Sequence, residues 1–79
     1  MTQEQIWQTV LAQLKMSVSP ANFATWFANT KISDISDGVA VISVPNSFSK
    51  EWLEQKYKTE ILKILRTIDL SIKDIKYII

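Results

Sequence analysis

The sequence contains no cysteine and no histidine, and it has only one glycine among its 79 residues. These absences exclude disulfides, thiolate nucleophiles, imidazole bases and the usual zinc sites. A single glycine, Gly38, also excludes P-loops, dinucleotide fingerprints and clamps built on two glycines. The remaining ionisable groups include no obvious carboxylate pair. We therefore expect a binding module with no catalytic, metal or cofactor site, and no enzymatic activity.

Long apolar runs and a strong net charge are missing as well. No apolar run approaches the roughly 18 residues that a membrane span needs, and the N-terminus lacks the features of a signal peptide. Nine basic residues against eight acidic ones give a net charge of +1, which is too small to attract nucleic acid or an anionic membrane strongly. Because small secreted domains usually need disulfides, these features predict a cytoplasmic protein that does not bind membranes.

Apolar residues make up 47% of the chain, which is enough for one modest core. We therefore expect a single domain over residues 1–79. The chain stops on Tyr77-Ile78-Ile79 without a polar tail, which indicates a domain cut from a longer protein.

Two helices are predicted in the first thirty residues. Thr2 and Gln5 have the spacing of a capping box at the start of the first helix. Ser19 and Pro20 suit the N-cap and the first position of a second, short helix that ends near Asn29-Thr30. The apolar stripe of the first helix comprises Trp7, Val10, Leu11 and Leu14, and the aromatic side of the second comprises Phe23, Trp26 and Phe27.

The next segment has the pattern of a β-hairpin. Asp37-Gly38 fits a type I′ turn, which needs positive φ at both positions, and it joins strands at 31–36 and 39–44. This register pairs Ile35 with Ala40, and Ser33 with Ile42. Alternation along the second strand places Ala40, Ile42 and Val44 toward the core and Val39 and Val41 toward solvent.

A third helix and a last strand complete the predicted fold. Pro45 ends the second strand because it cannot donate to the ladder, and Asn46 can cap a helix that runs to about Thr67. Asp69 ends this helix, and residues 72–79 are expected to form a strand. The order helix, helix, strand, strand, helix, strand defines an α+β domain, in which the crossover helix makes the last two strands parallel. The helix stripe comprises Leu53, Tyr57, Ile61, Ile64 and Ile68, and the last strand has Ile75, Tyr77 and Ile79 on one side.

Two surface features differ from an ordinary solvent-exposed face. Residues 1–30 carry only two charges, Glu4 and Lys15, which is typical either of an interface core or of a Gln-rich solvent face. Phe48 and Trp52 lie opposite the apolar stripe of the third helix, and exposed aromatics there indicate a binding surface. The alternative is that the first turn of this helix bends, or that the first helix covers Trp52.

The third helix also carries a basic face, formed by Lys56, Lys63 and Arg66. Basic groups beside aromatics can hold single strands of nucleic acid. Acidic residues dilute this charge, and Glu54 and Lys58 have the spacing of a surface ion pair. A solvated helix face and a weak single-strand contact are therefore the two interpretations. The diluting residues are Glu51, Glu54 and Glu60.

Taken together, these residues resemble the N-terminal domain of the bacterial chromosomal replication initiator DnaA. The most specific segment is Pro45-Asn46-x-Phe48-x-x-x-Trp52-Leu53, but the resemblance covers nearly the whole chain. The rest of the pattern comprises Trp7 with Leu11 and Leu14, Phe23-x-x-Trp26-Phe27, Asp37-Gly38 before alternating apolar residues, Val44, Tyr57, Ile61 and a terminal Ile/Tyr strand.

The resemblance implies a KH-like α+β fold and a docking role. Domains of this family self-associate at the replication origin, help to recruit the replicative helicase and are the targets of initiation regulators. ATP binding and recognition of origin DNA belong to later domains of such initiators. By position, the implied self-association residues are Ile6, Trp7, Leu11 and Trp52, and the implied helicase- or regulator-binding residues are Asn22, Thr25, Trp26, Asn46 and Phe48.

Some positions qualify this carry-over. Some relatives have an acidic residue where this chain has Asn22, so a charged helicase contact is not implied here. A KH domain grips nucleic acid with a GXXG loop, which the single Gly38 cannot supply. Trp7 lies near the centre of its helix stripe and is either a core or an interface residue. Any nucleic-acid contact is expected to be weak and to use Lys56, Lys63 and Arg66.

Overall fold

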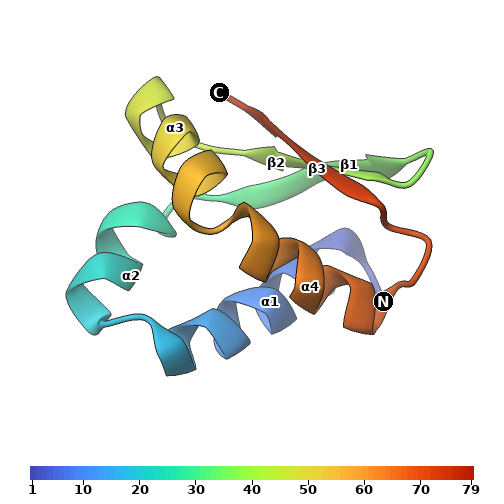
Figure 1. Cartoon of the computed structure of the whole chain (residues 1–79), viewed down its shortest axis with the longest axis horizontal. Coiled ribbons are helices and arrows are strands. Elements are labelled where there is room, and N and C mark those ends of the chain that lie inside the picture. The colour runs from blue at the N-terminus through green and yellow to red at the C-terminus, as the bar shows by residue number, and fades with distance from the viewer.

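Helices pack against one face of a three-stranded sheet in the computed structural model, which describes all residues 1–79 (Figure 1). The α+β class and the element order are as predicted, except that the third predicted helix is divided into two. None of the helices combines the length and the hydropathy that a membrane-spanning segment requires. The elements are α1 (Gln3–Ser17), α2 (Pro20–Trp26), β1 (Lys31–Ser36), β2 (Val39–Ser43), α3 (Ser47–Lys56), α4 (Lys58–Ile68) and β3 (Asp74–Ile78).

The first two helices begin where their capping residues predict. The Thr2 hydroxyl accepts from the Gln5 N–H at 3.1 Å, and the Thr2 N–H donates to the Gln5 side chain at 2.9 Å. Ser19 caps α2 in the same way, and Pro20 occupies its first turn. α2 ends at Trp26, a few residues before the predicted end, and Asn29 then adopts a positive φ of 61°.

The sheet has the order β1-β2-β3, with β1 and β2 antiparallel and β2 and β3 parallel, as predicted. Asp37 and Gly38 have φ values of 52° and 78°, which confirms the predicted turn. Ile35 pairs with Ala40 as predicted, whereas the pairing of Ser33 with Ile42 is wrong.

A β-bulge at Ser33 explains this error, because Ile32 instead of Ser33 lies opposite Ile42. Ile32 and Ile35 are three residues apart, so a regular strand with a period of two would place them on opposite faces. One additional residue lets Ile32 lie buried and Ile35 half-buried beneath the helices. The predicted inward residues Ala40 and Ile42 of β2, and Val44 directly after it, are buried as expected.

The prediction of a continuous third helix is wrong. The helix breaks at Tyr57, whose φ and ψ are −123° and −3°. The break lets the two halves pack against different parts of the core. α3 contacts α2, while α4 turns to lie along α1 (Figure 1). Leu53 of α3 and Ile61 and Leu65 of α4 are consequently all fully buried.

The last strand is shorter than predicted. Ile75 and Tyr77 are buried as predicted, but Ile79 is 67% exposed and its placement with them is wrong. β2 ends at Ser43, which pairs with Ile78, so no residue of β2 is left to pair with Ile79. The predicted Glu54–Lys58 ion pair is also replaced, because the Lys58 ammonium reaches across to Asp74 of β3 at 3.2 Å.

Candidate protein-docking site

Three aromatic side chains form a stacked group at the surface where α2 meets α3. The Trp26 ring lies nearly parallel to Phe48, with centroids 5.4 Å apart and planes 12° apart. It is also nearly parallel to the Trp52 ring, with centroids 4.2 Å apart and planes 4° apart. Phe48 is 69% exposed, while Trp26 and Trp52 are half-buried. We call Trp26, Phe48 and Trp52 the aromatic patch.

Local sequence signals place these side chains. Asn46 caps α3 by accepting from the Ser49 N–H at 2.8 Å, which sets Phe48 in the first turn of the helix. Trp52 lies four residues later and therefore on the same side of α3. Trp26 is the last residue of α2 and approaches both from the neighbouring helix.

The aromatic patch continues into the interior through further aromatic contacts. The ring centroids of Trp52 and Tyr57 are 5.0 Å apart. The edge of the Tyr57 ring contacts the buried Phe27, with centroids 5.1 Å apart. Phe27 in turn stacks on Phe23 at 5.5 Å. The rings of the aromatic patch therefore pack against aromatic side chains that reach the core, and these contacts hold the rings in place without a bound partner.

These positions confirm that Phe48 lies outside the buried stripe. Trp52 is half-buried against Trp26 and Tyr57, and the alternative that the first helix covers Trp52 is not observed, because α1 does not contact α3. Helix periodicity groups Trp26 with Phe23 and Phe27, and the resemblance groups it with Phe48, but neither predicts that its ring stacks on Phe48 and Trp52. The available sequence signal was a Trp near the end of one predicted helix and a Phe and a Trp near the start of another.

Uncharged polar side chains lie near the aromatic patch on α2 and just before α3. Asn22 lies one turn before Trp26 on α2, and both Asn22 and Thr25 are exposed. Thr25 donates its hydroxyl hydrogen to the Ala21 carbonyl at 2.8 Å. Asn46 is exposed two residues before Phe48. The implied helicase- and regulator-binding residues are thus brought to one region of the surface.

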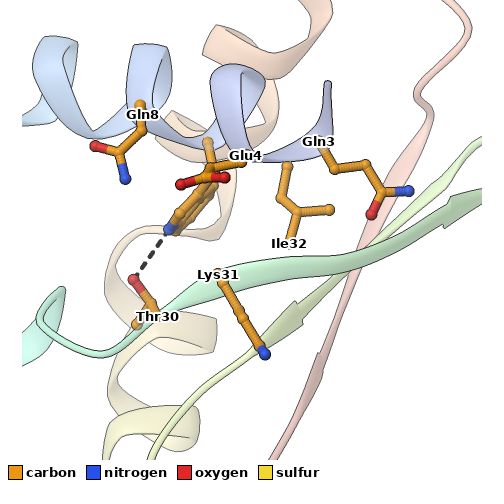
Figure 2. A pocket seen from close by; sticks show the side chains of 7 residues that line it. Gln3, Glu4, Gln8, Thr30, Lys31 and Ile32 are labelled. Atoms are coloured by element: carbon orange, nitrogen blue, oxygen red, sulfur yellow. Dashed lines mark hydrogen bonds between the residues drawn. The ribbon is translucent and has the colours of Figure 1, made fainter. Parts of the chain in front are cut away.

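The implied self-association residues do not form one surface. Trp7 is 1% exposed, and its indole N–H donates to the Thr30 hydroxyl at 3.1 Å (Figure 2). Of the two interpretations of Trp7, the core position is the one observed. Ile6 is buried as well, Leu11 is half-buried, and Trp52 belongs to the aromatic patch.

Two hollows are lined by implied self-association residues of α1, one by Trp7 and the other by Leu11. One, of about 470 Å³, lies between α1 and the start of β1, where the side chains of Glu4 and Lys31 border it (Figure 2). The other, of about 270 Å³, lies between α1 and α2 and is lined by Leu11, Lys15 and Phe23 among others. The Lys15 ammonium lies 5.9 Å from the Phe23 ring centroid. Leu11 is therefore the implied self-association residue that a partner can reach on α1.

The predicted basic residues are only partly brought together. Lys56 and Lys63 line a hollow between α1 and α4, and Arg66 is exposed but does not line it. Glu60 lies in the same hollow and accepts from the Ser17 hydroxyl at 3.1 Å. This carboxylate reduces the local positive charge.

Groups with a perturbed pKa lie outside the aromatic patch. Burial, with a smaller contribution from Glu54, raises the pKa of Tyr77 well above its usual value. Hydrogen bonds from Ser71 lower the pKa of Asp69, and the Ile75 N–H and then Lys58 lower that of Asp74. The chain contains no group of three or more His, Cys, Asp or Glu side chains that could hold a metal ion.

The fold and the aromatic patch define a small α+β interaction domain. The DnaA N-terminal domain family matches residues 4–67, and the chain belongs to this family. This membership confirms the resemblance and the prediction that the chain is a non-catalytic interaction domain.

A curated relative and a solved structure support the assignment. The chain is 38% identical over 65 residues to the chromosomal replication initiator protein DnaA of Deinococcus deserti. That match covers 82% of the chain but only 14% of the relative. The fold is similar to that in a crystal structure of a HobA–DnaA (domain I–II) complex from Helicobacter pylori. The TM-score is 0.74 at 20% identity, over 92% of this chain and 94% of that one.

Proposed function

We propose that this chain docks other proteins during the initiation of chromosome replication, in the cytoplasm. Its partners are a second copy of itself, the replicative helicase and initiation regulators. The aromatic patch is the observation that carries the proposal, because a large exposed ring supported by two half-buried ones is typical of an interaction surface. The HobA–DnaA complex of the H. pylori relative supports a regulator as one partner.

Binding at this surface is expected to be weak for a single copy. Only three aromatics and a few uncharged polar groups form it, so the interface lies at the small end of the range, under about 1,200 Å². Several copies assembled at one origin would raise the effective concentration of a partner that binds more than one of them. Weak individual contacts then give tight but reversible recruitment.

The test is the substitution Phe48→Ala, compared with Leu70→Ala. Both remove a large exposed apolar side chain, but Leu70 is 78% exposed in the turn after α4, away from the aromatic patch. We expect Phe48→Ala to weaken binding to the replicative helicase by roughly 30-fold, as for an interface hot spot. Leu70→Ala should bind like the wild type, and both should keep the wild-type circular dichroism spectrum. Full helicase binding by Phe48→Ala would reject the site.

Weak binding of single-stranded nucleic acid is the second candidate. It is favoured by the position of Lys56 and Lys63 around one hollow between α1 and α4. Such binding would fall steeply with salt, because it depends on counterion release. Titration with a single-stranded oligonucleotide at two salt concentrations separates it from protein docking, and Lys56→Gln with Lys63→Gln should remove it.

A further inference from the structure

We propose that Glu51 extends the aromatic patch into a site for a protein segment that carries a basic side chain beside a large apolar one. This inference rests on the proposed docking function and specifies the chemistry of the partner. Phe48, Glu51 and Trp52 are spaced by three and four residues, so they lie on one face of α3. Phe48 and Glu51 are both exposed there.

Glu51 is the charged side chain that shares the face of α3 with Phe48. α2 has no charged residue at all. Within α3, Lys50 and Glu54 are rotated by roughly 200° and 240° from Phe48, at about 100° per residue. Lys56 lies one turn after Trp52, further from Phe48 along α3 than Glu51, and lines the hollow between α1 and α4. The charge next to Phe48 is therefore negative, although the chain as a whole carries a net charge of +1.

No cation of the chain neutralises this carboxylate. The ion pair within the chain joins Lys58 to Asp74, and the Glu51 carboxylate makes no ion pair and accepts no hydrogen bond within the chain. The indole N–H groups of Trp26 and Trp52 are also without an acceptor, and neither is sealed in the interior. The surface thus offers apolar rings, two hydrogen-bond donors and one unpaired negative charge.

Charge complementarity then selects the occupant. An amphipathic helix with a Lys or Arg one turn from a Leu, Ile or Met would cover the rings and place its cation beside Glu51. Carbonyl oxygens of the same segment could accept from the two indoles. A nucleic acid or an acidic segment would instead be repelled by the carboxylate.

The test compares Glu51→Gln with Glu54→Gln in the intact chain. Both substitutions remove one negative charge from α3, so the net charge changes equally, but only Glu51 lies beside Phe48. Binding to the replicative helicase of the same organism is measured at low and high salt. We expect Glu51→Gln to bind roughly fivefold more weakly at low salt, with a smaller difference at high salt. Glu54→Gln should bind like the wild type, and Glu51→Lys more weakly than Glu51→Gln.

The outcomes separate this proposal from the docking function. If Glu51→Gln and Glu54→Gln bind equally well while Phe48→Ala does not bind, the patch docks its partner without Glu51 and the proposal is rejected. Tighter binding by Glu51→Gln would indicate an acidic partner and also reject it. An effect on self-association alone, measured by sedimentation, would make a second copy the occupant and overturn it. Unchanged binding by Phe48→Ala would instead reject the docking function itself.

Discussion

Trp26 and Trp52 lie face to face, with ring centroids 4.2 Å apart and planes 4° apart. One belongs to the end of α2 and the other to the middle of α3, so their contact joins two helices at the surface. α2 has no fully buried residue between Pro20 and Trp26. The attachment of this helix therefore depends on the half-buried Phe23 and Trp26, which pack against the core, and on the buried Phe27 that follows.

A double-mutant cycle should detect this stack. We expect Trp26→Ala and Trp52→Ala to be non-additive, with a coupling energy of about 0.5–1.5 kcal/mol, as for other aromatic pairs. The free energy of unfolding of each variant is measured by urea denaturation. Phe48→Ala serves as the control, because its exposed ring should change stability by no more than about 0.5 kcal/mol. Strict additivity would mean that the two rings contribute independently.

Trp7 and Leu11 should respond differently to substitution, although both are implied self-association residues. Trp7→Ala removes a fully buried ring and its hydrogen bond to Thr30, at a cost of about 3–5 kcal/mol. This loss is close to the whole stability expected for a domain of this size, so circular dichroism should show a largely unfolded chain. A folded Trp7→Ala variant would contradict the core position.

Leu11→Ala tests self-association without that loss. Leu11 is half-buried and lines the hollow between α1 and α2, so the variant should stay folded. Sedimentation velocity should show weaker self-association than for the wild type, because the accessible apolar area on α1 is reduced. Gln13→Ala, on the same helix and exposed, is the matched control. Equal behaviour of both variants would remove α1 from the self-association surface.

Much of the fold could be predicted because its signals are local. The capping box of Thr2 and Gln5 and the turn at Asp37-Gly38 act within a few residues, and both form as predicted. The bulge at Ser33 and the break at Tyr57 have no such local cause. They arise because Ile32 and the two halves of the third predicted helix must all reach one core, which only the packed structure determines.

The candidate site was predictable to a similar extent. Helical spacing alone places Phe48 outside the buried stripe, and Phe48 is exposed. The contact of Trp26 with Phe48 and Trp52 joins different helices, so periodicity within one helix cannot reveal it. Helical spacing could not decide the role of Trp7, because its position in the apolar stripe fits both a core residue and an interface residue. Only its burial in the structure distinguishes the two.

The hairpin turn should be sensitive to a side chain at Gly38. Its φ of 78° is rarely adopted by other residues, and a Cβ at this position would lie 3.0 Å from the Ser71 carbonyl oxygen. The Gly38 carbonyl also accepts from the N–H groups of Lys73 and Asp74, which hold the start of β3. We expect Gly38→Ala to destabilise the chain by about 1–2 kcal/mol. Asp37→Asn, which suits the same turn, should change thermal stability little.

The Tyr77 hydroxyl is buried between the sheet and the helices and has no hydrogen-bond partner. Tyr77→Phe removes this unsatisfied group and keeps the ring, so the free energy of unfolding should stay the same or rise by about 1 kcal/mol. Urea denaturation at neutral pH measures the change. A clear loss of stability would mean that the hydroxyl makes a favourable contact after all. Tyr57→Phe is the control for the loss of a tyrosine hydroxyl.

Tyr77 should also make the fold sensitive to alkali. Burial raises its pKa above the usual value near 10, so the folded state holds this proton more tightly than the unfolded state does. The resulting stability is complete below pH 10 or so and is lost as the pH rises from there toward the folded-state pKa, because the unfolded chain then ionises first. Wild-type unfolding, followed by circular dichroism from pH 9 upward, should show this loss, and Tyr77→Phe should show less of it than Tyr57→Phe. If the two variants lose stability in parallel with pH, the buried hydroxyl does not control the alkaline transition.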